Sequence, residues 1–318
     1  MTLILTSVNS LGVIQVVDRL VTVQAPDQDV QPWDARSNKT ILFSARDALC
    51  TISYSGLAYI AQLPTDQWIA QNLRREPLSL GRNDRPAAFT MGRVTNWPSI
   101  GPAIQRLVTD LELAMARLMP ERLRSAPLSI VIAGWQLYRA KRRRTFGLII
   151  EKLRDDAAVT IKRLPRHFGR GCALITEPEY LSSDEQNTLL NVIGPATADE
   201  TEQAMIAEIR RVAEEAGLGR VGPHCMCVML PPPDLGWARV RYDSPVPDVG
   251  YLVSSRGADP FPAAFTPWIL TQDLTMAPAV HSGGCTTTQI GPWQLRIEGS
   301  PQESSLTVHS SQRRRGHP

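Results

Sequence analysis

The sequence lacks the features that mark membrane-spanning and disulfide-rich secreted proteins. Its apolar runs have the length of β-strands and are much shorter than the roughly 20 residues of a membrane-spanning helix. No basic segment precedes the first apolar run, as it would in a secretory signal peptide. The five cysteines are scattered and odd in number, which does not suit a disulfide framework. We therefore expect a cytoplasmic protein that has no contact with a membrane.

The sequence also has little excess charge, with 34 Lys and Arg against 31 Asp and Glu and a net charge of +3. A basic cluster comprises Arg139 and residues 141–144. Such a cluster could bind nucleic acid or an acidic partner. No aromatic stacking motif accompanies it and the net charge is small, so we interpret it as a solvated turn between strands. The basic run 313–315 belongs to a polar tail. We expect no nucleic-acid partner.

Metal-ligand motifs are equally sparse. His224, Cys225 and Cys227 lie close together, but a Cys-x-Cys pair with one histidine lacks the second ligand pair of a zinc site. We interpret them as residues of a buried strand, and we expect neither a metal nor an organic cofactor.

Grouped strands and paired helices are the main organisational signal. Two β-branched apolar runs flank residues 9–12, a hairpin signature. Apolar residues at steps of three and four predict a helix over 100–118, and helices are also expected over 64–75, from 183, and over 199–216. The order is four strands, two helices, three or four strands, two helices and two strands. It predicts an α+β fold of two stacked antiparallel sheets, each covered outside by a helix pair.

The domain organisation follows from this order. Residues 1–243 hold all of the grouped elements and are expected to form one domain. Residues 244–318 form a Pro-rich C-terminal extension with strand-like pieces at 268–270 and 293–297, and its tail from about residue 300 is expected to be disordered.

The start of the chain carries the clearest chemistry. Removal of Met1 would leave Thr2 with a free α-amine, which has an ordinary pKa of about 7.7–8.0. Such an amine can take the proton of its own hydroxyl and make Oγ1 a nucleophile. Many chains begin with Met-Thr, so a catalytic role for Thr2 needs support from the residues that follow.

That support is a resemblance to the N-terminal-nucleophile hydrolases, in particular the proteasome β-subunits and HslV-type peptidases. Asp18 follows Thr2 by sixteen positions, as in that family, and Lys39 stands at the head of a strand after a loop about five residues longer than usual. The stretch 53–58 matches the family's small-residue turn after the fourth strand. The run 132–135, Ile-Ala-Gly-Trp, is similar to its fifth strand. The resemblance covers roughly residues 2–242 and implies a four-layer αββα sandwich.

The resemblance also implies roles for these residues. Thr2 would be the nucleophile and its amine the base, while Lys39 would lower the pKa of the amine and stabilise developing negative charge. Asp18 would pair with Lys39 and orient it. A backbone N–H near Gly56, or alternatively Ser55, would donate to the oxyanion.

Two departures from the family concern supporting groups. Arg170 replaces the serine of the family's Gly-Ser-Gly bend, and the stretch 217–221 has neither the aspartate nor the serine found after the fourth helix. Both departures leave the expected fold unchanged and bear on activity.

Three functional interpretations therefore stay open. The first is a threonine-type endopeptidase that cleaves peptide or protein substrates, assembled as a homo-oligomeric ring or stacked rings that could serve an unfoldase ATPase. The second is a catalytically inactive shell or scaffold subunit, and the third is a small-molecule amidohydrolase.

Overall fold

The computed structural model describes residues 2–9, 12–23, 31–34, 37–75, 89–117, 126–137, 143–153, 158–163, 173–175, 181–215, 220–232, 237–243, 249–250, 261–262, 264–265, 267–278, 280–281, 286–290, 293–298 and 305–310. Over these residues the chain has a mixed, broadly α+β structure. The helices that they include are α1 (Thr65–Arg74), α2 (Ile100–Arg117), α4 (Ser183–Ile193) and α5 (Ala198–Glu215), close to the bounds that the sequence predicts.

The first of two large sheets, here called the N-terminal sheet, is built around the opening hairpin. All of its strand pairs are antiparallel. In spatial order its strands are β13 (Ala173–Ile175), β1 (Ile4–Asn9), β2 (Gly12–Asp18), β14 (Cys225–Leu230), β15 (Trp237–Asp243), β24 (Ser305–Ser310), β23 (Trp293–Glu298) and β22 (Thr286–Ile290).

The second large sheet, here called the lysine sheet because β5 follows Lys39, has one parallel pair, β5 with β19. Its other pairs are antiparallel. Its strands are, in order, β12 (Val159–Arg163), β11 (Arg143–Lys152), β10 (Leu128–Leu137), β6 (Ala48–Gly56), β5 (Thr40–Ala45), β19 (Trp268–Leu270), β20 (Leu274–Met276) and β9 (Phe89–Met91).

Four short strand pairs complete the described structure. They are β3 (Val21–Val23) with β4 (Gln31–Asp34), β7 (Tyr59–Ile60) with β8 (Leu63–Pro64), β16 (Val249–Gly250) with β17 (Phe261–Pro262), and β18 (Ala264–Phe265) with β21 (Val280–His281).

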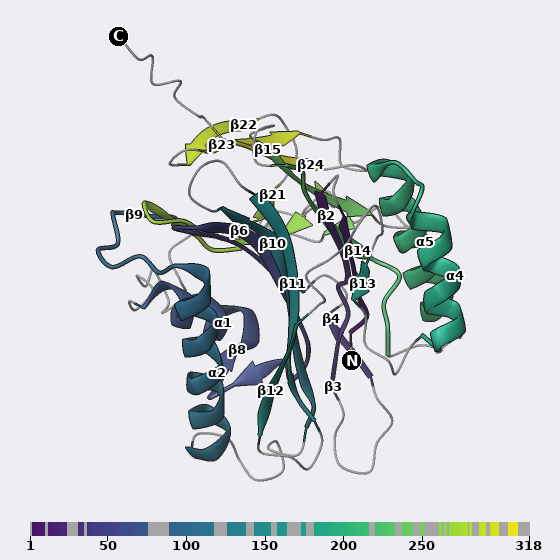
Figure 1. Ribbon diagram of the computed structural model, residues 1–318, viewed down its shortest axis with the longest axis horizontal. Helices are drawn as coiled ribbons and strands as arrows, with labels where there is room; N and C mark the ends of the chain where they lie inside the picture. Colours follow the sequence, from purple (N-terminus) through teal and green to yellow (C-terminus); the bar gives the residue numbers. More distant parts are fainter. Residues whose placement is uncertain are drawn as a thin grey trace.

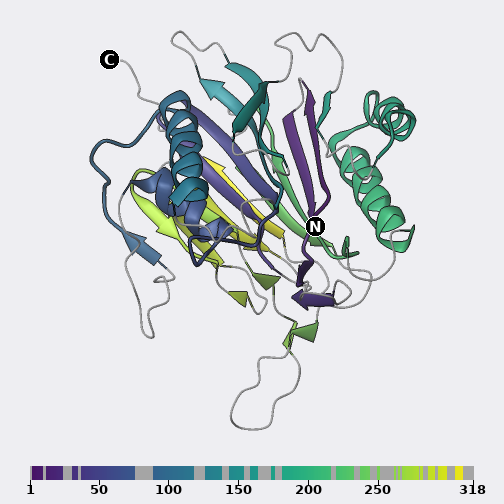
Figure 2. The same ribbon diagram turned by 90° about the horizontal axis from the view of Figure 1, so that it is seen from below.

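The buried residues of the described ranges form three clusters, because successive side chains along a strand point to opposite faces of its sheet. One buried cluster joins the facing sides of the two sheets and includes Val17 of β2 and Val131 of β10. A second packs α1 and α2 on the lysine sheet, and a third packs α4 and α5 on the N-terminal sheet. Figures 1 and 2 show the two helix pairs on opposite outer sides of the strands. The space between the sheets is therefore lined by one face of each.

The C-terminal segment contributes strands to both large sheets. β19 and β20 extend the lysine sheet beyond β5, and β22, β23 and β24 extend the N-terminal sheet beyond β15. β24 falls in the stretch that we expected to be disordered. β24 pairs with β15, so its backbone has hydrogen-bonding partners that cannot be seen in the sequence of the tail.

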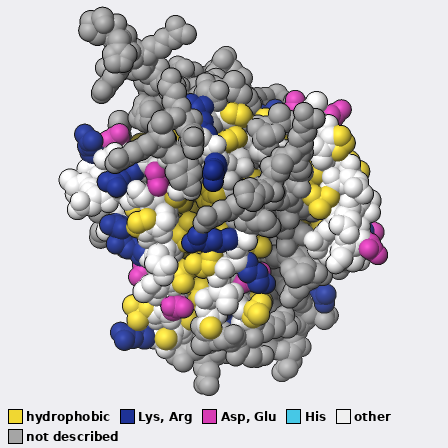
Figure 3. Space-filling model, viewed as in Figure 1, with side chains coloured by type: hydrophobic (Ala, Val, Ile, Leu, Met, Phe, Trp, Pro, Cys, Tyr) yellow, Lys and Arg dark blue, Asp and Glu magenta, His cyan; other side chains and the backbone are white. Residues whose placement is uncertain are grey.

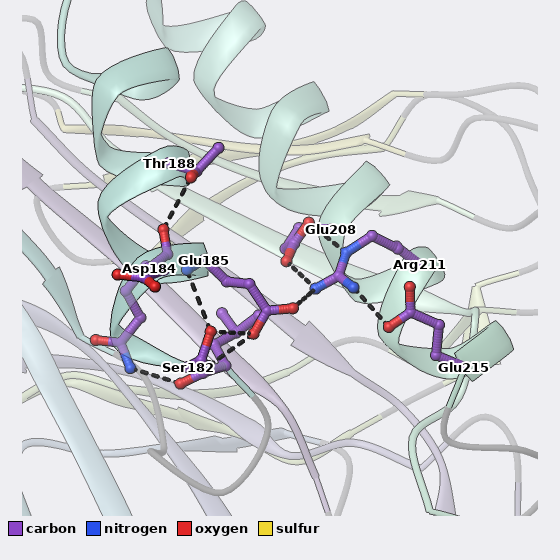
Figure 4. A network of polar contacts seen from close by, with 9 residues as sticks. Ser182, Asp184, Glu185, Thr188, Glu208, Arg211 and Glu215 are labelled. Carbon is purple, nitrogen blue, oxygen red and sulfur yellow. Dashed lines mark hydrogen bonds and ion pairs between the residues drawn. The ribbon is translucent and has the colours of Figure 1, made fainter.

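A polar network joins the helices α4 and α5 (Figure 4). Ser182 and Glu185 form a capping box at the start of α4, which satisfies backbone N–H groups in its first turn. Arg211 of α5 forms ion pairs with Glu185 of α4 and with Glu208 and Glu215 of its own helix. This helix pair is thus tied together at its solvent-facing side. Among the described residues, no helix is both long and apolar enough to cross a membrane.

Candidate active site

Thr2 lies at the head of β1, where the alternation of that strand directs it between the two sheets. Ile4 and Val8, at even positions of β1, pack in the cluster between the sheets, and Thr2 continues this alternation. The residue is buried, with 4% of its surface exposed. Lys39 comes immediately before β5 of the facing sheet, so the two residues approach each other from opposite layers.

Three acceptor atoms of described residues lie around the Lys39 ammonium. Its Nζ donates to Thr2 Oγ1 at 2.5 Å and to the carbonyl oxygen of Leu20, and it lies 3.5 Å from Asp18 Oδ1. Lys39 is only 3% exposed, so these contacts are largely shielded from water. The Lys39 side chain therefore links the hydroxyl of Thr2 to the carboxyl group of Asp18.

Asp18 ends β2 and is fully buried beside Lys39. Its Oδ1 accepts from the backbone N–H of Leu3 at 2.9 Å, and its Oδ2 accepts from Leu20 at 3.2 Å and Gly222 at 3.1 Å. Burial raises the pKa of Asp18, while the Lys39 charge and the N–H groups of Gly222 and Leu20 oppose that rise. Donors thus meet both oxygens of Asp18, which fixes the carboxyl group in one orientation beside Lys39.

Ser55 and Gly56, the two candidates for the oxyanion site, have different surroundings. The Ser55 hydroxyl donates to the backbone carbonyl oxygen of Thr2 at 2.9 Å, which ties the end of β6 to the start of the chain. Gly56 has a φ of +96°, and a Cβ there would lie 2.1 Å from the carbonyl oxygen of Pro127. The backbone geometry at the end of β6 thus requires glycine whatever its chemical role, and Ser55 contacts Thr2 directly.

Gly222 is a member of the site that the sequence argument missed. It follows α5 by seven residues and brings its backbone N–H to Asp18, 204 positions away in the chain. A Cβ at Gly222 would lie 2.7 Å from the Cβ of Leu20, so the close approach depends on glycine. The sequence signal was the pair Gly222-Pro223 between a helix and a strand, which indicates a turn and does not indicate its partner.

Other expected features lie partly outside the described residues. Met1, Arg170 and residues 217–219 are among these, as is most of the basic cluster near residue 140. Arg143 and Arg144 of that cluster begin β11. On the face shown in Figure 3, Lys and Arg side chains lie interspersed with acidic and apolar ones.

The thiols of Cys225 and Cys227 are buried in β14, and burial raises the pKa of both, which makes them poor nucleophiles and poor metal ligands at neutral pH. Among the residues that the structure describes, no group of three or more His, Cys, Asp or Glu side chains is placed to hold a metal ion.

A scan against protein-family models gives no match, and a search of curated proteins finds none either. The geometry around Thr2 is therefore the basis on which a function can be assigned.

Proposed function

We propose that this chain is an N-terminal-nucleophile hydrolase that cleaves amide bonds with Thr2 after removal of Met1. The observation that carries the proposal is the position of the Lys39 ammonium, 2.5 Å from Thr2 Oγ1 and in contact with Asp18. Three residues that the sequence separates by up to 37 positions meet at one buried point. A lysine beside a hydroxyl has its main chemical use in stabilising the negative charge that develops on oxygen.

The chemistry needs only groups that the chain supplies. The α-amine of Thr2 takes the proton of Oγ1, and Oγ1 attacks the carbonyl carbon of the substrate amide. The C–N bond then breaks, the leaving nitrogen takes the proton from the amine, and an ester joins the acyl group to Thr2. Water attacks that ester, releases the carboxylic acid and restores the hydroxyl. Lys39 holds positive charge beside Oγ1 in each of these steps, and Asp18 orients Lys39.

The arrangement of elements supports the same proposal. Two facing sheets with a helix pair on the outer side of each agree with a four-layer αββα sandwich of the N-terminal-nucleophile type. In this interpretation β1 and β2 carry Thr2 and Asp18, and the strand after Lys39 lies in the facing sheet. We extend the proposal to a threonine-type endopeptidase that is cytoplasmic, acts on peptides or proteins and assembles as a ring or stacked rings, with an unfoldase ATPase as its partner.

The inactive shell or scaffold is the alternative function. The observation that favours it is sequence-based: Arg170 stands where the family has a serine, and residues 217–221 lack the family's supporting aspartate and serine. A small-molecule amidohydrolase would use the same Thr2 chemistry, and a monomer or dimer in solution would favour it over a ring peptidase.

The test compares two threonines of the same N-terminal segment. Thr2→Ala removes the nucleophile, whereas Thr6→Ala removes a buried hydroxyl that accepts a hydrogen bond from Gln15. Hydrolysis of fluorogenic peptide amides should be lost in the first variant and kept in the second, and Thr2→Ser should keep part of it. Turnover in the Thr2→Ala variant would contradict the proposed mechanism, and a wild-type protein that retains Met1 would favour the scaffold.

A further inference from the structure

The strand that follows Lys39 has a neighbour from the C-terminal segment. β5 pairs with β6 on one side, and on the other it pairs in parallel with β19, in the register Trp268 opposite Ile41. Without β19, β5 would be an edge strand with one row of unpaired backbone groups. The segment beyond residue 243 thus supports the backbone that leads from the candidate active site.

A chain of side-chain contacts connects β19 to the residue before Lys39. The indole Nε1 of Trp268 donates to Asp66 Oδ2 at 2.9 Å, and Asn38 Nδ2 donates to the same oxygen at 3.2 Å. Asn38 Oδ1 in turn accepts from the backbone N–H of Thr40 at 3.3 Å. These hydrogen bonds therefore hold the residues directly before and after Lys39, which are Asn38 and Thr40.

These contacts are made away from water. Trp268 is 2%, Asn38 7% and Asp66 9% exposed. Asp66 belongs to the first turn of α1; burial raises the pKa of its carboxyl group, while its hydrogen bonds with Trp268 and Asn38 oppose that rise. Because water is excluded there, the hydrogen bonds that Asp66 accepts from Trp268 and Asn38 are stronger than they would be in solvent. Asp66 is the point at which α1, β19 and the backbone before β5 meet.

We propose that Trp268 and Asp66 are positioning residues that fix the backbone at Asn38 and thereby hold the Lys39 ammonium against Thr2 Oγ1. The catalytic consequence rests on the proposed function, whereas the effect on the Lys39 side chain does not. The C-terminal segment would then be part of the active-site support. Its loss would loosen Lys39 without removing any group that touches Thr2.

A second tryptophan provides a matched control. Trp97 is 3% exposed, packs in the same apolar cluster as Trp268, and donates from its Nε1 to the carbonyl oxygen of Ser44 at 2.6 Å. Ser44 lies near the other end of β5, away from Lys39. Each tryptophan therefore gives one indole hydrogen bond to this region, and only Trp268 is linked to Asn38.

The first experiment compares Trp268→Phe with Trp97→Phe in the full chain by NMR of ¹³C-labelled lysine. The sequence has four lysines, so the Lys39 ε-methylene can be assigned by one substitution. A side chain held in one conformation gives two distinct Hε resonances. We expect Trp268→Phe to merge them and Trp97→Phe to leave them separate. Unchanged Lys39 signals in Trp268→Phe, or equal changes in both variants, would overturn the proposal.

The second experiment measures the rate at which an epoxyketone labels Thr2. A displacement of about 1 Å can slow a reaction by about 100-fold, so we expect a loss of about 10- to 100-fold in Trp268→Phe and no loss in Trp97→Phe. Asp66→Asn should also slow labelling, and its combination with Trp268→Phe should cost little more because both act through Asn38. Fully additive losses would contradict a shared path. If the wild-type protein does not react at all, the proposed function fails, and the lysine signals still decide whether Trp268 positions Lys39.

Discussion

Lys39 and Asp18 form a buried pair, so we expect the loss of either charge to destabilise the fold. The substitution Lys39→Met tests this. Methionine keeps most of the length of the side chain and removes its charge. Asp18 would then stay buried with three backbone N–H donors and without its cation. Breaking a buried pair in this way costs about 3–5 kcal/mol, and the remaining N–H bonds place the expected loss at about 3 kcal/mol.

A double-mutant cycle measures the interaction energy between Lys39 and Asp18 apart from the other effects of each substitution. Asp18→Asn alone leaves Lys39 without its carboxylate and points an amide NH₂ at backbone N–H groups, so we expect a loss of similar size. The combination removes both charges together. The double variant should therefore be more stable than the sum of the single losses predicts, by about 1–3 kcal/mol.

The control is an ion pair of the lysine sheet in which the lysine reaches solvent. Lys162 and Glu151 are 2.5 Å apart, and the side chain of Lys162 is 63% exposed while that of Glu151 is 10% exposed. Lys162→Met should cost at most about 1 kcal/mol. Urea unfolding at neutral pH measures all four variants, with changes in midpoint at constant slope taken as stability. If Lys39→Met costs no more stability than Lys162→Met, or if the losses in the cycle are additive, Lys39 and Asp18 do not stabilise each other.

Two further predictions concern Gly222 and the start of α4. Gly222→Ala should destabilise the fold by about 1–3 kcal/mol and slow labelling of Thr2, because its Cβ would push the N–H away from Asp18. Gly101→Ala, where a Cβ meets nothing within 4 Å, should not destabilise, and equal losses in both variants would refute this reason. The pKa of Glu185 is lowered chiefly by its hydrogen bonds with Ser182, so the folded state binds its proton less tightly than the unfolded state does. Its contribution to stability is therefore present above the ordinary glutamate pKa of about 4.3 and lost as the pH falls through the lowered value. Urea midpoints should show Glu185→Gln to be less stable than wild type at about pH 7, with the difference shrinking below about pH 4; a difference that grows on acidification would contradict the sign.

Local patterns were sufficient to predict most of the elements. The steps of three and four in α2 put Ile104, Leu107 and Leu111 on one face, and the structure buries all three. The resemblance to N-terminal-nucleophile hydrolases led us to expect Thr2, Asp18 and Lys39 at a common site, and the structure brings them together. These features depend on periodicity or on a known spacing, both of which can be seen in the sequence.

Contacts between distant segments were not predictable in the same way. The N–H of Gly222 meets Asp18 only because α5 returns the chain to the start of β14 beside β2. The parallel pairing of β19 with β5 likewise joins segments more than 200 residues apart. No local pattern encodes such a partner, since a short apolar run specifies a strand and not its neighbour.

The most direct test of the central claim is the intact mass of the natively expressed protein before and after incubation with an epoxyketone. This reagent closes a ring with both a hydroxyl oxygen and a free α-amine, so a stable adduct requires both groups on the same residue. The account predicts a mass that lacks methionine and gains one inhibitor, with the modification on Thr2. A protein that keeps Met1 and gains no adduct would contradict it.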